Sequence, residues 1–146
     1  MADGDTVKVL LTTLPRMPHG AMPALVVGGW PRILRDGEIV AGDAATVEGT
    51  LSHNAEMRHP RSAIGFSRDS ATLFLLTVDG RSEHSGGVTL VELARFMRQV
   101  GAWQAMNFDG GGSTTMVIDG AVVNVPSDNT GEREVGNALL VVRRRP

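Results

Sequence analysis

Short apolar runs separated by turn-forming residues dominate this chain. Runs of this length that are rich in valine, isoleucine and leucine are typical of β-strands. They predict strands over residues 7–11, 62–67, 72–78, 104–108, 114–118, 121–125 and 135–142. The run over 72–78 is almost uninterrupted in apolar residues, and we therefore expect a central strand buried on both faces.

One segment, residues 89–100, has helical spacing instead. Its apolar residues recur at intervals of three and four and form one face: Leu90, Leu93, Ala94, Met97 and Val100. Thr89 and Glu92 have the spacing of a capping box, which satisfies free N–H groups at the start of a helix. Gly101 suits the C-terminal end. This segment is the dominant predicted helix.

Two Asp-Gly pairs predict hairpins. Asp36-Gly37 lies between the short segments 32–35 and 38–40, and Asp119-Gly120 lies between residues 114–118 and 121–125. Asp-Gly favours a tight turn in which both central residues have positive φ. Residues 42–59 are polar and predict a long loop with a short helical turn. The expected class is α+β, a mainly antiparallel twisted sheet with one helix packed on it.

Composition narrows the functional classes. The chain has 146 residues, which fits one domain, and 42% of them are hydrophobic. A net charge of −2 argues against a nucleic-acid partner. The absence of cysteine excludes disulfides and zinc–thiolate sites. No apolar run reaches the roughly 18 residues of a membrane span, and the first five residues give no sign of a signal peptide, so the localisation stays open.

The segment from Asn107 to Thr115 is the most informative for chemistry. A carboxylate, Asp109, comes directly before three glycines and three hydroxyl residues. Glycines let a backbone approach a ligand closely, and successive N–H groups in such a turn can bind an anion. The combination suits hydrolysis of a phosphate-bearing substrate. The alternative is a simple tight turn between two strands.

Other polar residues recur directly after predicted strands, where one edge of a sheet could gather them. Each also has an ordinary explanation: Asp79 and Asp128 as turn formers, Glu132 and Arg133 as a surface ion pair, Arg61 as a surface residue. His59 is more often a loop histidine than a general base. The full set is Asp79, Arg81, Asn107, Asp109, Asn124, Ser127, Asp128, Glu132 and Arg133.

Several of these stretches together resemble the phosphodiester glycosidase family. Many members of that family are bacterial, and members are often exported. The resemblance rests on residues 107–116, 124–128 and 132–139, and extends upstream to Gly-Gly-Trp-Pro at 28–31, His-Pro-Arg-Ser-Ala-Ile-Gly at 59–65, Val-Asp-Gly-Arg at 78–81 and 87–94. Phe108 and Glu134 depart from the family's usual leucine and proline. Family domains usually carry a further N-terminal half, so the single domain of residues 1–146 is expected to be the C-terminal part.

The resemblance implies hydrolysis of a sugar-1-phosphodiester at the sugar C1–O bond. Asp109 is then the carboxylate at C1, with Asp128, Glu132 and Asp79 as candidates for a second carboxylate or for sugar hydroxyls. Substrate binding is assigned to Arg61, Arg81 and Arg133, to backbone and hydroxyl groups of Gly110, Gly111, Gly112, Ser113 and Thr114, and to Asn107 and Asn124. No cofactor is implied, although a divalent cation such as calcium or magnesium stays open.

Three other interpretations remain. The same glycines and arginines suit a non-catalytic module that binds phosphorylated or anionic glycans. Asp79, Asp109 and Asp128 would suit a calcium or magnesium site, although no known ligand spacing is present. The chain could also be a structural assembly unit. An uncovered sheet edge favours self-association, so a homo-oligomer is a further expectation.

Overall fold

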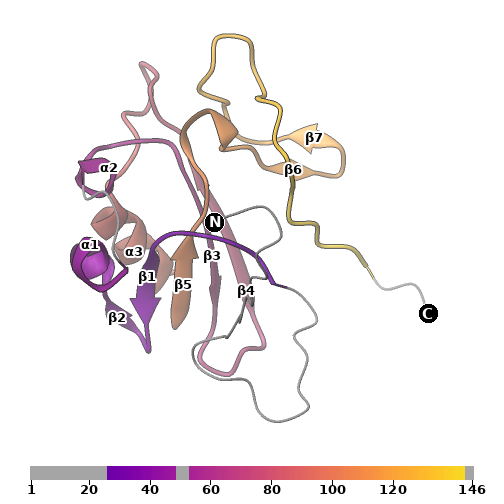
Figure 1. Cartoon of the computed structure of the whole chain (residues 1–146). Coiled ribbons are helices and arrows are strands. Elements are labelled where there is room, and N and C mark those ends of the chain that lie inside the picture. The colour runs from indigo at the N-terminus through magenta and orange to yellow at the C-terminus, as the bar shows by residue number, and fades with distance from the viewer. Residues whose placement is uncertain (1–25, 49–52, 144–146) are drawn as a thin grey trace, which may run out of the picture.

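The computed structural model describes residues 26–48 and 53–143 (Figure 1). It is an α+β fold built on a five-stranded sheet in the order β2-β1-β5-β3-β4, in which every neighbouring pair is antiparallel. Its strands are β1 (Arg32–Arg35), β2 (Glu38–Ile39), β3 (Arg61–Phe66), β4 (Leu73–Val78) and β5 (Gln104–Asn107). The predicted fold class is confirmed.

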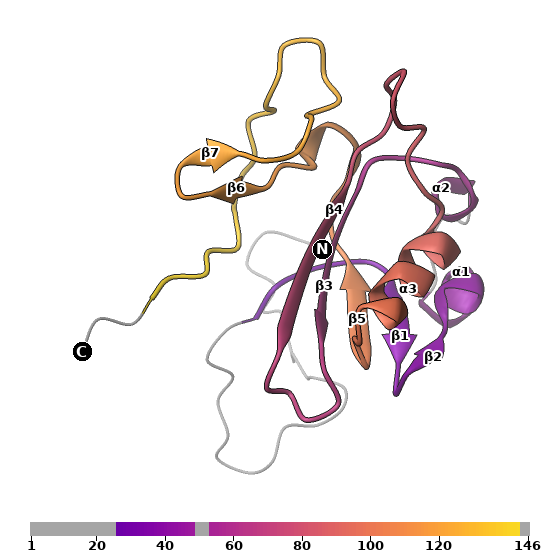
Figure 2. The ribbon, with the colours of Figure 1, turned by 180° about the vertical axis from the view of Figure 1, so that it is seen from behind.

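One long helix, α3 (Leu90–Gln99), covers one face of this sheet (Figure 2). It begins where the sequence predicts, because Thr89 and Glu92 form the reciprocal hydrogen bonds of a capping box. Its buried residues pack against the apolar side chains of β1, β3 and β5. This core consists of Ile33, Leu34, Ala41, Ala63, Val88, Leu90, Leu93, Ala94, Met97, Ala102 and Ala105.

Residues 42–59 were predicted as a loop, but most of the described ones, 42–48 and 53–59, lie in short helices beside α3 (Figure 1). They are the 3-10 turn η1 (Ala41–Asp43), α1 (Ala44–Glu48) and α2 (His53–Glu56). The prediction was right in expecting a helical turn but underestimated its extent. The strand predicted over residues 7–11 lies outside the described residues.

Both Asp-Gly hairpins are confirmed. Asp36 and Gly37 have φ of 52° and 80°, and Asp119 and Gly120 have φ of 50° and 81°. The second hairpin joins β6 (Val117–Ile118) to β7 (Ala121–Val122) and forms its own two-stranded sheet. Positive φ at both central residues matches the twist of the flanking strands, which is why Asp-Gly predicts this turn.

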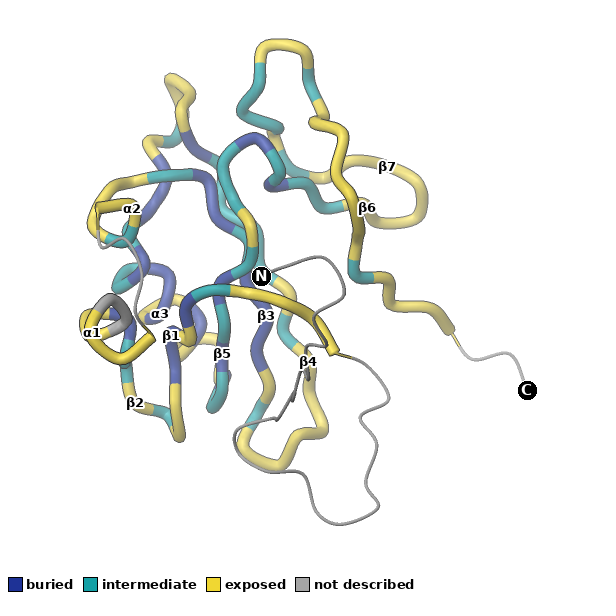
Figure 3. The backbone as a smooth tube through the Cα atoms, viewed as in Figure 1, coloured by how far each residue is buried: buried dark blue, intermediate teal, exposed yellow. Residues whose placement is uncertain are grey.

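The prediction of a central, doubly buried strand at residues 72–78 is wrong. Within the described residues β4 is an edge strand that pairs only with β3. Its side chains alternate: Phe74 packs against the core, whereas Leu73 and Leu75 on the other face are each 40% exposed. Figure 3 shows β4 coloured as intermediate and exposed along its length. The apolar run identified a strand but carried no information about its neighbours. Self-association through this edge stays a prediction.

The closing strand predicted over residues 135–142 is also absent. These residues have no regular secondary structure, and Leu140, Val141 and Val142 are exposed. An apolar run favours a strand only where another strand offers it hydrogen bonds, and no strand in the described part of the chain pairs with this segment. None of the described helices is long and apolar enough to cross a membrane.

Candidate active site at one end of the sheet

The antiparallel register brings three candidate segments to one end of the sheet. Arg61, at the start of β3, pairs with Val78 at the end of β4. Ala63 pairs with Asn107, the last residue of β5. The residues that follow β4 and β5 therefore leave the sheet beside the residues that enter β3. This places His59, Asp79–Arg81 and the loop after Asn107 in one region.

Main-chain hydrogen bonds, one within the loop and one to Pro60, fix the conformation of the loop after β5. Gly111–Ser113 form a 3-10 turn, η2. The Gly111 N–H donates to the Pro60 carbonyl at 2.9 Å, and the Ser113 N–H donates to the Gly110 carbonyl at 3.1 Å. These two residues therefore do not offer the free N–H groups that were expected to bind an anion, because both N–H groups donate to main-chain carbonyls.

The three glycines instead allow other groups to come close. A Cβ on Gly110 would lie 2.6 Å from the Pro60 carbonyl oxygen. A Cβ on Gly111 would lie 3.3 Å from both terminal nitrogens of Arg81, and one on Gly112 would overlap the guanidinium of Arg133 and a carboxylate oxygen of Asp128. Two guanidinium groups are thus packed directly against the glycine loop.

Asp109 is exposed at the start of this loop. One of its carboxylate oxygens accepts a hydrogen bond from the Gly110 N–H at 3.0 Å. Among the described residues no ion pair holds this carboxylate. It is accessible to a ligand that approaches the glycine loop.

Arg81 is held by a histidine. Its Nη2 lies 3.3 Å from Nδ1 of His59, and within residues 26–48 and 53–143 no carboxylate pairs with it. Burial, followed by the positive charges of Arg61 and Arg81 and by His53, lowers the pKa of His59. The sequence interpretation passed over His59 as a loop residue, although the His-Pro-Arg motif that contains it was a usable signal.

Asp128 and Arg133 form an ion pair beside Gly112. Both Nε and Nη2 of Arg133 lie 2.8 Å from Oδ2 of Asp128. This pair closes a short turn within the segment that follows β7, and it leaves the charge of Asp128 neutralised. Glu132 is exposed, and it has no ion pair in the part of the chain that the structure describes.

Asp79 and Asn124 tie the β6–β7 hairpin to the end of β4. Oδ1 of Asp79 accepts from Nδ2 of Asn124 at 3.1 Å and from the Val125 N–H at 3.0 Å. Asn124 in turn accepts from the Met116 N–H at 2.7 Å. These contacts give Oδ1 of Asp79 a structural role, and a catalytic role for its carboxylate stays a prediction.

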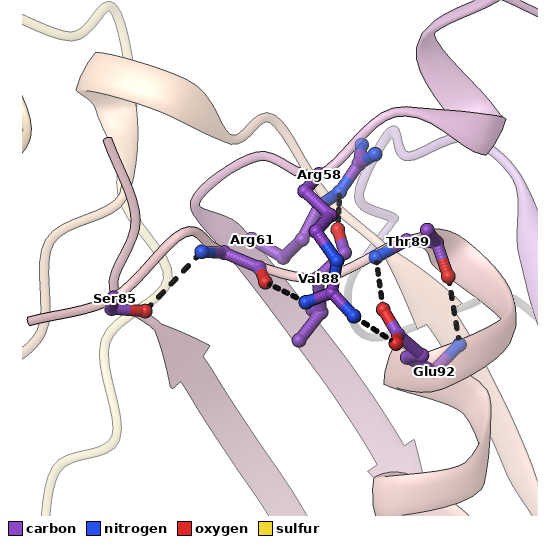
Figure 4. Close-up of polar contacts among 7 residues, drawn as sticks. Arg58, Arg61, Ser85, Val88, Thr89 and Glu92 are labelled. Atoms are coloured by element: carbon purple, nitrogen blue, oxygen red, sulfur yellow. Dashed lines mark hydrogen bonds and ion pairs between the residues drawn. The ribbon is translucent and has the colours of Figure 1, made fainter. Parts of the chain in front are cut away.

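Arg61 does not face the glycine loop as a free cation. It is buried, and its Nε and Nη2 donate to main-chain carbonyls of Val88, Asn54 and Met57 at 3.2, 2.6 and 2.9 Å. Figure 4 shows the neighbouring segment, where Arg58 bonds to both Gly87 and Glu92. Burial, reinforced by Arg81, lowers the pKa of Arg61. These bonds give Arg61 a structural role, and its contact with phosphate stays a prediction.

Two further predicted site residues are also buried supports. Asn107 donates from Nδ2 to the Trp30 carbonyl at 2.6 Å, and Thr114 lies 3.4 Å from the hydroxyl of Ser62. Both fix the route of the chain into and out of the glycine loop. The alternative metal site is not assembled, since no three His, Asp or Glu side chains of the described residues come close enough to hold a metal.

Comparisons with known proteins agree with this picture. The phosphodiester glycosidase family model matches residues 1–142. The mouse N-acetylglucosamine-1-phosphodiester alpha-N-acetylglucosaminidase is 34% identical over 104 residues, covering 66% of this chain and 20% of its own. The prophage-derived uncharacterized protein YomE of Bacillus subtilis is 36% identical over 96 residues, covering 66% of this chain and 15% of its own.

Solved structures extend the likeness to the fold. The catalytic domain of zebrafish N-acetylglucosamine-1-phosphodiester alpha-N-acetylglucosaminidase, auto-inhibited by pro-peptide, is 30% identical with a TM-score of 0.62. The match covers 70% of this chain and 35% of that domain. The chain thus spans about a fifth of the length of the mouse relative. With a family model that matches nearly its whole length, this chain belongs to the phosphodiester glycosidase family.

Proposed function

We propose that this chain acts at the end of its sheet on a sugar-1-phosphodiester, cleaving the sugar C1–O bond to release free sugar and a phosphomonoester. One observation carries the proposal: the guanidinium of Arg81 lies against Gly111, two residues after the exposed Asp109, and no carboxylate pairs with it in the described part of the chain. A guanidinium fork suits phosphate oxygens, and a carboxylate suits the cationic carbon.

The chemistry of the leaving group explains why an arginine is placed at the phosphate and a carboxylate at the sugar. A departing phosphate ester is already stable as an anion near neutral pH, because its second pKa is about 6. It needs positive charge and hydrogen-bond donors as negative charge develops, more than it needs a strong proton donor. Arg81 supplies this charge, and Arg133 is close by but neutralised by Asp128.

Asp109 has the complementary role at the sugar. The C1 carbon becomes oxocarbenium-like as its bond to phosphate breaks, and a carboxylate beside it stabilises that charge. The same carboxylate acts as the nucleophile or as the base that activates water. Asp109 is exposed and accepts a hydrogen bond from the Gly110 N–H, so its carboxylate is available for either step.

Replacing Asp109 by asparagine tests the proposal. We expect Asp109→Asn to lower kcat by about 100-fold or more, because the amide neither stabilises the cation nor accepts a proton. The assay measures phosphomonoester release from N-acetylglucosamine 1-(methyl phosphate). Asp119→Asn is the matched control, since Asp119 lies in the exposed β6–β7 turn and asparagine tolerates its φ of 50°.

Near-normal turnover by a folded Asp109→Asn variant would remove Asp109 from the chemistry. Binding of the diester without any turnover by the unmodified chain would favour the alternative function, a binding module for anionic glycans. In that case substrate-induced thermal stabilisation replaces turnover as the readout for every variant.

A further inference from the structure

The backbone of His59 lies outside the named strands but is held by two main-chain hydrogen bonds. It forms an isolated bridge with Val88, in which the His59 N–H donates at 3.2 Å and the Val88 N–H donates back at 3.1 Å. Gly87 lies on the same backbone so closely that a Cβ there would overlap the His59 carbonyl. The direction in which the imidazole leaves the chain is therefore fixed from two sides.

The hydrogen bond to Arg81 sets the tautomer of this imidazole. A guanidinium only donates hydrogen bonds. Nδ1 of His59, 3.3 Å from Nη2 of Arg81, must therefore be the acceptor, and the ring proton lies on Nε2. A protonated ring would lose this acceptor and would repel the guanidinium.

The surroundings keep the ring neutral. Arg61, Arg81 and His53 are the charged and titratable groups that act on it, and with burial they lower its pKa. The acceptor at Nδ1 is thus present at neutral pH.

Arg81 needs such a partner. It is exposed, it has a φ of 57°, and it lies in the loop that follows β4. A free arginine side chain loses rotamer entropy when it binds a ligand. A neighbour that holds the guanidinium against Gly111 beforehand reduces that cost.

We propose that His59 is a positioning residue: its Nδ1 holds the Arg81 guanidinium against Gly111, in the place where a phosphodiester binds. The inference rests on the proposed function, because it concerns how the phosphate-binding arginine is oriented. His59 itself acts only through Arg81.

Two substitutions separate this role from a merely structural one. The amide of His59→Asn places an oxygen near Nδ1, whereas His59→Gln places its amide near Nε2. Affinity for N-acetylglucosamine 1-(methyl phosphate) is measured by calorimetry in the Asp109→Asn background, so that the probe is not consumed. We expect His59→Asn to stay within about threefold of the parent and His59→Gln to bind about tenfold more weakly.

A double-mutant cycle identifies Arg81 as the route of the effect. If His59 acts through Arg81, adding His59→Gln to Arg81→Met weakens binding no further. The ring nitrogen shifts of His59 in an NMR spectrum should show the Nε2–H tautomer. Equal losses in His59→Asn and His59→Gln, multiplying losses in the cycle, or an Nδ1–H tautomer would each overturn the inference.

The outcomes also distinguish this inference from the proposed function. An Nδ1–H tautomer together with Arg81-dependent diester binding overturns the role of His59 alone. An Nε2–H tautomer with no loss of affinity in Arg81→Met overturns the proposed phosphate site, and the inference built on it fails with it. Thermal denaturation of each variant confirms that the protein is folded.

Discussion

Replacing Gly87 by alanine is expected to lower the free energy of unfolding by about 3 kcal/mol, one of the larger effects available to a single methyl group. Gly87 has a φ of 80°, which alanine adopts only with strain, and the added Cβ would overlap the main chain of His59. The backbone atoms involved belong to the bridge between His59 and Val88, so they have little freedom to move away.

The position also holds other contacts together. The Gly87 carbonyl accepts from Arg58 at 2.7 Å, and its N–H donates to the Ser85 hydroxyl at 3.2 Å (Figure 4). Because Arg58 also pairs with Glu92, displacing Gly87 disturbs the start of α3. We therefore expect the loss of stability to extend beyond the loop.

Gly86→Ala provides the matched control for this prediction. Its Cβ would meet nothing within 4 Å, so the change should stay within about 0.5 kcal/mol. Urea denaturation of both variants, followed by circular dichroism, measures the difference. Similar midpoints for the two variants would show that the segment adapts to a side chain at Gly87 and that His59 is not rigidly held.

Replacing Arg81 by methionine is expected to lower kcat by about 100- to 1000-fold on a sugar-1-phosphodiester, with little change in stability. The long apolar side chain keeps much of the packing of arginine but removes the charge that meets the departing phosphate. An electrostatic contact aimed at developing charge contributes more in the transition state than in the bound substrate, so we expect this fall in kcat in addition to a loss of affinity for the diester of about tenfold.

Two comparisons make this prediction specific. Arg81→Lys keeps a positive charge but loses the fork, so its activity should lie between those of Arg81→Met and the parent. Arg98→Met, on the exposed side of α3, should leave kcat unchanged. Steady-state kinetics of the three variants is the measurement, and a full-activity Arg81→Met variant would place the phosphate elsewhere.

The sequence predicts those features whose causes are local. The capping box at Thr89, the apolar face of α3 from Leu90 to Met97 and the two Asp-Gly turns depend on neighbouring residues alone, and they are confirmed. Val100, which the spacing assigned to the same face, is instead the exposed C-cap of the helix. The position of β4 at an edge depends on which strands lie beside it, and an apolar run contains no such information. The irregular course of residues 135–142 has the same origin.

In the candidate site, too, the contacts made between residues distant in sequence could not be predicted. The motif at Asp109 indicates a glycine loop, but its spacing does not reveal that the Gly111 N–H is used by Pro60, or that Asp79 supports Asn124. Residue type made Arg61 and Arg81 equivalent candidates. Burial separates them, because Arg61 is enclosed by main-chain carbonyls whereas Arg81 is exposed beside the loop.

Hydrolysis in ¹⁸O-labelled water tests the central claim most directly. Cleavage of the sugar C1–O bond leaves the phosphate oxygens untouched, so ³¹P NMR should show a released phosphomonoester without ¹⁸O. Asp109→Asn should reduce the amount of this product without changing its label. A phosphomonoester that carries ¹⁸O would mean attack at phosphorus, and it would contradict the account of Asp109 and Arg81 given above.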